Sequence, residues 1–228
     1  MTLKRKELQK IVSPYLFEMG YLFFKESRNS TDGLYAKKLA NGLFMTLGLN
    51  ISRLYDCQFT IDLYLSRTTT IACCWKDIPR ACYTRPGFYL TEEELQPYGH
   101  DGKIIKDLWW SVDEESINGF VQTLKKALYR MNVDEALIKR IWESTEVNKL
   151  VEQSQSVIEL MESDKSILKN IDKEVAKKCI SLPPQEWYNS ASIVLYTHLP
   201  DQSVNDGLVK RLAEDAFRQF VLNNIHNK

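Results

Sequence analysis

Few of the patterns that identify a function at first sight occur in this chain of 228 residues. Its 30 basic and 30 acidic side chains cancel, so no overall charge attracts it to nucleic acid or anionic lipid. No apolar run approaches the ~18 residues that a membrane span needs. The charged first residues show no signal-peptide pattern. We therefore expect a cytoplasmic protein that binds neither nucleic acid nor a membrane.

Cysteine, histidine and glycine are also too scarce and too scattered to predict a chemical site. The 5 cysteines are odd in number and irregularly spaced, which argues against a disulfide framework. Cys73 and Cys74 would face opposite sides of a strand and could not share one metal ion. A nucleophilic Cys82 would need a base, and only His100 is near it in sequence. Without a glycine-rich phosphate loop either, we expect no catalytic residue, no metal and no cofactor.

Hydrophobic periodicity predicts an α+β fold with the sheet in the first half of the chain. Over residues 8–19 apolar positions recur every three or four residues, as on one face of a helix. Over 43–51 and 57–66 apolar and polar side chains alternate, which is typical of strands with one face in the core and the other in water. Shorter apolar stretches complete an antiparallel sheet of four or five strands: 21–25, 34–39 and 71–75.

From residue 113 onward the periodicity is helical. Asp113 has the position of an N-cap residue, and we expect its helix to cover the same face of the sheet as the first one. A boundary near Asn132 then separates an α+β sheet domain of residues 1–131 from a helical region of residues 132–228 packed on it. Five helices are expected in that region: 133–142, 147–161, 167–179, 187–199 and about 208–221.

Between the two parts, residues 76–106 contain several prolines and glycines and predict a long loop. One helical turn is expected near Thr91, because Thr91 and Glu94 have the spacing of a capping box. Loops of this length inside compact domains are often functional. We therefore expect a contact surface in this loop and in the two tryptophans after it.

Four short segments in the first half of the chain have a common order and spacing: 20–25 (GYLFFK), 59–63 (FTIDL), 82–87 (CYTRPG) and 107–110 (DLWW). Together they resemble an uncharacterised bacterial family known only as a domain of unknown function (DUF4304-like), over about residues 4–131 and none of the helical half. Such families resemble the small α+β immunity proteins that bacteria pair with toxins. The resemblance therefore implies protein binding without a reaction.

The two tryptophans and two loop residues are candidates for binding. Trp109 and Trp110 could form a platform of large contact area, or one or both could close the core of the sheet. Arg85, with Tyr83 beside it, could clamp a carboxylate or phosphate, or remain a solvated loop arginine.

Two residues of the 57–66 strand complete the candidate set. Asp62 could pair with a basic side chain, act as a general base, or be only a solvated surface group. Tyr64 shares its outward face. We predict a non-enzymatic protein-binding module, immunity-like or regulatory, that binds an unidentified protein through this face and the 85–110 loop. The alternative is an enzyme or small-molecule binder in which Arg85 holds an anionic group, and a deep pocket would favour it.

Overall fold

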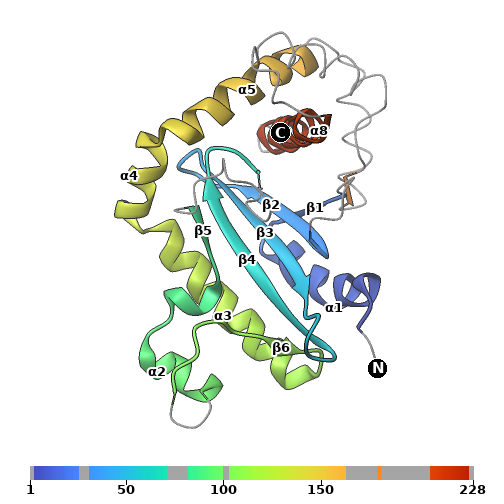
Figure 1. Cartoon of the computed structure of the whole chain (residues 1–228), viewed down its shortest axis with the longest axis vertical. Helices are drawn as coiled ribbons and strands as arrows, with labels where there is room; N and C mark the ends of the chain where they lie inside the picture. Colours follow the sequence, from blue (N-terminus) through green and yellow to red (C-terminus); the bar gives the residue numbers. More distant parts are fainter. Residues whose placement is uncertain are drawn as a thin grey trace.

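The computed structural model describes residues 3–25, 31–70, 82–99, 103–162, 179–180 and 206–225. In Figure 1, α3, α4 and α5 form an arc around a central sheet, and α8 lies inside the arc. The elements in chain order are α1 (Arg5–Glu18), β1 (Leu22–Phe24), β2 (Gly33–Lys38), β3 (Phe44–Ile51), β4 (Gln58–Ser66), β5 (Tyr83–Thr84), the 3-10 helix η2 (Pro86–Tyr89), α2 (Glu92–Leu95), the 3-10 helix η3 (Gln96–Tyr98), β6 (Trp110–Ser111), α3 (Glu114–Asn132), α4 (Glu135–Glu143), α5 (Thr145–Glu162), β7 (Cys179–Ile180) and α8 (Asp206–Ile225).

The sheet confirms the predicted α+β class. Its strand order is β5-β4-β3-β2-β1-β7, with β6 also paired to β4. Neighbouring strands are antiparallel except β1 and β7, which are parallel. The two-residue strands β5, β6 and β7 take the described sheet beyond the four or five strands expected. The prediction of a helix up to Cys179 is wrong at its end, because Cys179 pairs with Phe23 in β7. The predicted strand 71–75 and helix 187–199 lie outside the described residues.

Three predicted helix boundaries are confirmed by their hydrogen bonds. After α1 and its C-cap Met19, the Gly20 backbone N–H donates to the Phe17 carbonyl at 2.9 Å, and its φ of 83° lies in the left-handed region that suits glycine. The Asp113 carboxylate accepts from the Ser116 backbone N–H at 2.9 Å and caps α3. Thr91 and Glu94 make both bonds of the predicted capping box. The same loop also contains β5 and the two 3-10 helices, so it has more regular structure than its composition predicts.

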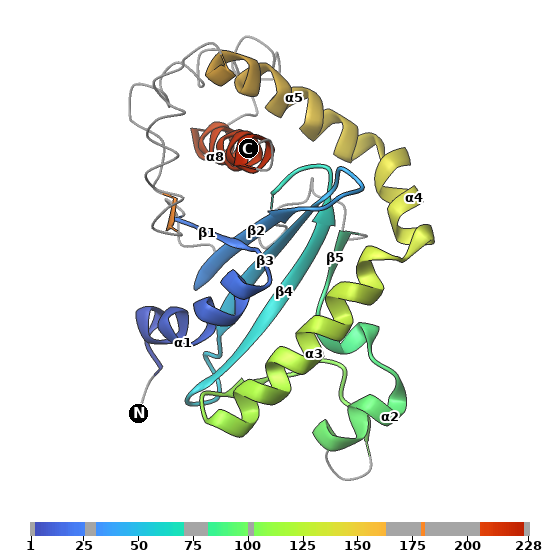
Figure 2. The same ribbon diagram turned by 180° about the vertical axis from the view of Figure 1, so that it is seen from behind.

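One face of the sheet meets α1 and α3 in the main hydrophobic core, as expected (Figure 2). Leu8, Val12 and Leu16 of α1 are fully buried there. On the α3 side, the ring of Phe120 lies 5.1 Å from the rings of both Phe59 and Trp110, in edge-to-face geometry. These aromatic contacts fix β4, β6 and α3 to one another.

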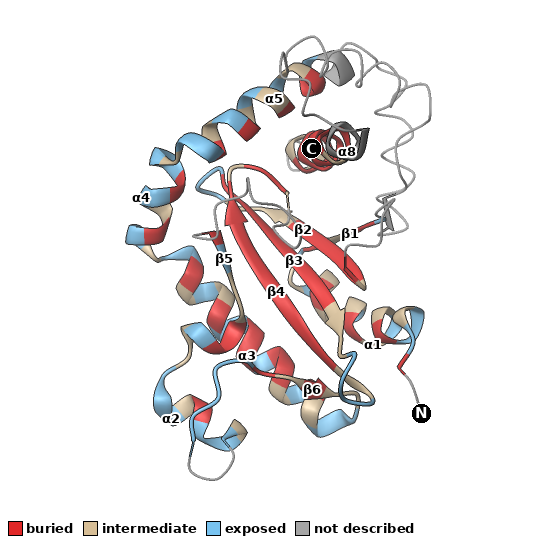
Figure 3. Cartoon of the chain, in the orientation of Figure 1, coloured by how far each residue is buried: buried red, intermediate tan, exposed pale blue. Residues whose placement is uncertain are grey.

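The opposite face of β4 was expected to meet water, and that prediction is wrong. Thr60, Asp62, Tyr64 and Ser66 are all buried (Figure 3). The Thr60 hydroxyl donates to the backbone carbonyl of Leu108 at 2.8 Å, so the chain before β6 satisfies this buried polar group. Distant segments therefore satisfy the polar groups that the alternating pattern assigns to solvent.

The C-terminal helix α8 is buried on all sides from residue 212 to residue 222. It packs between α5 and β2 (Figure 1). Buried polar side chains of α8 include Asp215 and Arg218, which contact Thr69 beyond the end of β4. Among the described residues, no helix combines the length and the apolar character needed to cross a membrane.

Candidate functional site

The site forms where β5 pairs with the edge of β4. Their antiparallel register joins Leu63 to Thr84 and Tyr64 to Tyr83, so the next position along it sets Arg85 opposite Asp62. The Arg85 Nε donates to Asp62 Oδ1 at 3.0 Å. Strand pairing thus brings two predicted site residues together from segments 23 positions apart.

Asp62 has several donors and little access to solvent. Its Oδ1 accepts from Arg85 and from the Tyr83 hydroxyl at 3.1 Å, and its Oδ2 accepts from the Asn50 amide at 2.8 Å. Only 9% of its side chain is exposed. Burial and the charge on Asp62 raise the pKa of Tyr83, which keeps that hydroxyl protonated as a donor. This geometry holds Asp62 in a fixed ion pair, which leaves it poorly placed to act as a general base.

Arg85 joins Asp62 to a second carboxylate. Its Nη1 donates to Asp107 Oδ1, and its guanidinium lies 5.4 Å from the centre of the Trp109 ring. Burial opposes the charge on Arg85, but the hydrogen bond to Asp107 and the negative charge of Asp62 outweigh it and raise the pKa of Arg85. The guanidinium is therefore permanently charged and held between two carboxylates.

The two adjacent tryptophans lie on opposite sides of the chain. Trp110 enters β6 opposite Phe59 and is buried in the core. Trp109 is half-buried and contacts Arg85. Adjacent residues in extended chain point to opposite faces, which explains why the two rings are separated.

The structure thus brings five of the six predicted site residues into one cluster, since Tyr64 also joins it with its ring 5.2 Å from that of Tyr83. Trp110 alone lies in the core.

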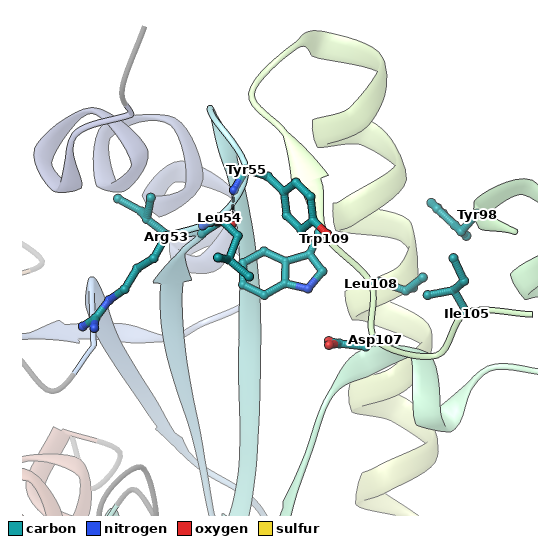
Figure 4. A pocket seen from close by; sticks show the side chains of 10 residues that line it. Arg53, Leu54, Tyr55, Tyr98, Ile105, Asp107, Leu108 and Trp109 are labelled. Atoms are coloured by element: carbon teal, nitrogen blue, oxygen red, sulfur yellow. Dashed lines mark hydrogen bonds between the residues drawn. The ribbon is translucent and has the colours of Figure 1, made fainter. Parts of the chain in front are cut away.

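Two open hollows flank this cluster, and Asp107 lines both. The larger, of about 1040 Å³, is shown in Figure 4, where Leu54 and Tyr55 stand beside the Trp109 ring. The smaller, of about 440 Å³, lies between Arg85, Phe88 and Asp107.

Large apolar side chains surround these hollows and remain exposed to solvent. Leu54 is 87% exposed and Phe88 is 58% exposed, and Tyr55 and Ile105 are also on the surface. Such groups gain free energy when a partner covers them. We call the set consisting of Leu54, Tyr55, Tyr83, Arg85, Phe88, Ile105, Asp107 and Trp109 the Asp107 surface.

Sequence reasoning did not select Asp107 or the Leu54–Tyr55 pair as site residues. A signal for the pair was present, because two large apolar residues occur in the turn between two strands, where polar residues are usual. Asp107 has no such signal. Its importance follows from its contact with Arg85, 22 positions earlier in the chain.

Of the residues considered for thiol or metal chemistry, only Cys82 lies in the described part of the chain with a shifted pKa. Cys82 is buried, and burial raises the pKa of its thiol to about 11, so the thiolate is scarce at neutral pH. His100, Cys73 and Cys74 lie outside the described residues. Within the described ranges, no group of three or more histidine, cysteine or acidic side chains could hold a metal ion.

Comparisons with protein-family models, with curated proteins and with solved structures give no match to this chain.

Proposed function

We propose that this chain is a non-enzymatic protein-binding module and that its partner docks on the Asp107 surface. The observation that carries the proposal is the exposure of large apolar side chains around a fixed ion pair. Leu54 and Phe88, which are 87% and 58% exposed, belong to different segments but border hollows that share Asp107. Specific interfaces commonly combine such an apolar centre with tyrosine, tryptophan and arginine.

The two ion pairs that Arg85 already makes favour a protein partner over a small anionic ligand. Two of its donor nitrogens already face carboxylates of the same chain, Asp62 and Asp107. A phosphate or carboxylate ligand on the remaining guanidinium donors would be repelled by both carboxylates. The hollows are also open to solvent, whereas small-molecule sites usually enclose most of their ligand.

The immunity-like form of this proposal rests on the family resemblance of residues 4–131, and a regulatory partner is the other form. A bacterial cytoplasm is the proposed location. The buried Cys82, which forms no disulfide, agrees with a reducing compartment.

The test is capture of a partner from lysate of the protein's own host with the tagged chain as bait. The double variant Phe88→Ala, Trp109→Ala removes apolar contacts on both sides of Asp107. The control variant Tyr129→Ala, Val133→Ala removes two exposed apolar side chains that line neither hollow. Thermal unfolding of each bait shows whether it remains folded.

We expect wild type and the control to capture the same protein in stoichiometric amount, and the Phe88, Trp109 variant to lose it while remaining folded. Equal capture by both variants would move the contact away from the Asp107 surface. Capture of no protein by the wild type would count against a protein-binding role and favour the ligand-binding alternative.

A further inference from the structure

The Asp107 surface presents a negative charge inside an apolar setting. On this basis we infer that its partner contributes a basic side chain, lysine or arginine, which meets Asp107 beside a bulky apolar side chain that fills the larger hollow. This inference rests on the proposed function and specifies the chemistry of the partner.

The cluster contains more negative charges than positive charges. One guanidinium, Arg85, faces two carboxylates, Asp62 and Asp107. Asp62 is buried and accepts from three donors, and Arg85 is only 21% exposed. The cluster therefore carries an excess negative charge, and its buried members cannot present that charge to a partner.

Asp107 is the exposed carboxylate of the cluster. Its side chain is 56% exposed, and it lines both hollows. A carboxylate has two oxygens with about four acceptor sites, and the bond from Arg85 engages one oxygen. Arg85 thus acts as a positioning residue that fixes Asp107 at the boundary of the hollows, with acceptor capacity left for a second cation.

Three described basic residues either line the larger hollow or belong to the same loop as Asp107. Arg53 lines the larger hollow, but in Figure 4 its side chain extends away from Trp109 and Asp107. Lys103 and Lys106, on the same loop as Asp107, line neither hollow. Among the described residues, Arg85 alone forms an ion pair with Asp107, so a lysine or arginine from a partner would meet the remaining acceptor sites of the carboxylate.

The larger hollow has an apolar wall. Leu54, Tyr55 and Trp109 lie together on one side of the larger hollow (Figure 4). An aliphatic or aromatic side chain of the partner would cover their exposed area, and a cation at Asp107 would also lie close to the face of an indole. A basic residue next to a bulky apolar residue matches both features.

A displayed library of random peptides, selected on the whole chain of 228 residues, tests this inference. Asp107→Asn keeps an oxygen toward Arg85 but removes the charge, and Asp107→Lys reverses it. Glu152→Gln, which removes an exposed carboxylate from α5, is the matched control. The Phe88→Ala, Trp109→Ala variant reports whether selected peptides use this surface.

We expect wild type and Glu152→Gln to select peptides with lysine or arginine beside a large apolar residue. Those peptides should bind Asp107→Asn about fivefold more weakly, as loss of a partly exposed ion pair implies. Their affinity for wild type should fall with added salt, and Asp107→Lys should select acidic peptides instead.

Other results would overturn the inference in distinguishable ways. Peptides that need Phe88 and Trp109 but are acidic or neutral would disprove the basic partner and leave the docking surface in place. Peptides indifferent to Phe88 and Trp109, or no enrichment at all, would contradict both the inference and the proposed function.

Discussion

Asp215 Oδ1 accepts hydrogen bonds from the backbone N–H and the hydroxyl of Thr69, at 2.7 and 2.5 Å, although 146 positions separate the two residues. The other carboxylate oxygen accepts from Ser154 of α5 at 3.0 Å and from Gln219 at 2.9 Å. Arg218 donates to the Thr69 hydroxyl at 3.0 Å. One fully buried carboxylate thus joins the chain after β4 to α5 and α8.

Asp215→Ala should be among the most destabilising substitutions in the chain. It leaves four buried donors without their acceptor, and we expect a loss of about 3 kcal/mol in the free energy of unfolding. Urea unfolding measures the change, with Glu159→Ala on the exposed face of α5 as the control. A loss below about 0.5 kcal/mol would mean that this network does not hold α8 in place.

Trp109→Ala and Trp110→Ala should separate binding from stability. Removing the Trp110 ring from its contacts with Phe59 and Phe120 should cost about 3–5 kcal/mol. Trp109 is only half-buried, so its removal should cost about 1 kcal/mol or less and abolish partner capture. Urea unfolding and capture assays on both variants provide the measurement. Similar stability losses would contradict the opposite placement of the two rings.

Gly87→Ala should disturb the loop that carries Asp107. A Cβ atom on Gly87 would lie 2.2 Å from the backbone carbonyl oxygen of Lys106, and that contact requires the chain to shift. We expect a loss of about 1–3 kcal/mol together with weaker partner capture. Lys106→Ala retains the carbonyl and serves as the control. If Gly87→Ala matched that control in both assays, the close approach would not matter.

Glu94→Gln should remove one component of the pH dependence of stability. Hydrogen bonds from Arg130 and from the Thr91 backbone lower the pKa of Glu94 from 4.5 to about 2. Because this pKa is lower in the folded state, ionised Glu94 stabilises the fold above about pH 4.5, and its contribution is lost as the pH falls toward 2.

The difference in unfolding midpoint between wild type and Glu94→Gln should therefore be largest above pH 4.5 and shrink steadily toward pH 2. Urea unfolding across this range measures it, and Glu93→Gln, at an exposed neighbouring position, controls for nonspecific charge effects. A difference that did not change with pH would show that the charge of Glu94 contributes nothing to stability.

Local patterns predicted much of the fold. The positions of β3 and β4 and the side chains that they turn toward the core, the caps at Asp113 and Thr91, and the end of α1 near Gly20 agree with the structure. Each depends on hydrogen bonds or side-chain spacing within a few residues, which the sequence displays directly. The strands β5, β6 and β7, of two residues each, are too short to show a period.

The face of β4 that carries Asp62 shows where such reasoning fails. Alternation correctly separated Asp62 and Tyr64 from the main core, but a polar face was equated with an exposed one. The structure buries this face, where Thr60 donates to the backbone carbonyl of Leu108 and Asp62 accepts from Tyr83 and gains an ion pair with Arg85. A pattern of period two reports which residues share a face, and it does not report what covers that face.

The sequence by itself determined the α+β class, the apolar face of each main strand and the helix caps, because these depend on neighbours within one or two turns of chain. Only the tertiary structure decided that Arg85 meets Asp62 and Asp107, that Trp109 and Trp110 serve different surfaces, and that Asp215 reaches Thr69. Those contacts join distant segments, and their free energy depends on the burial and partners that folding provides.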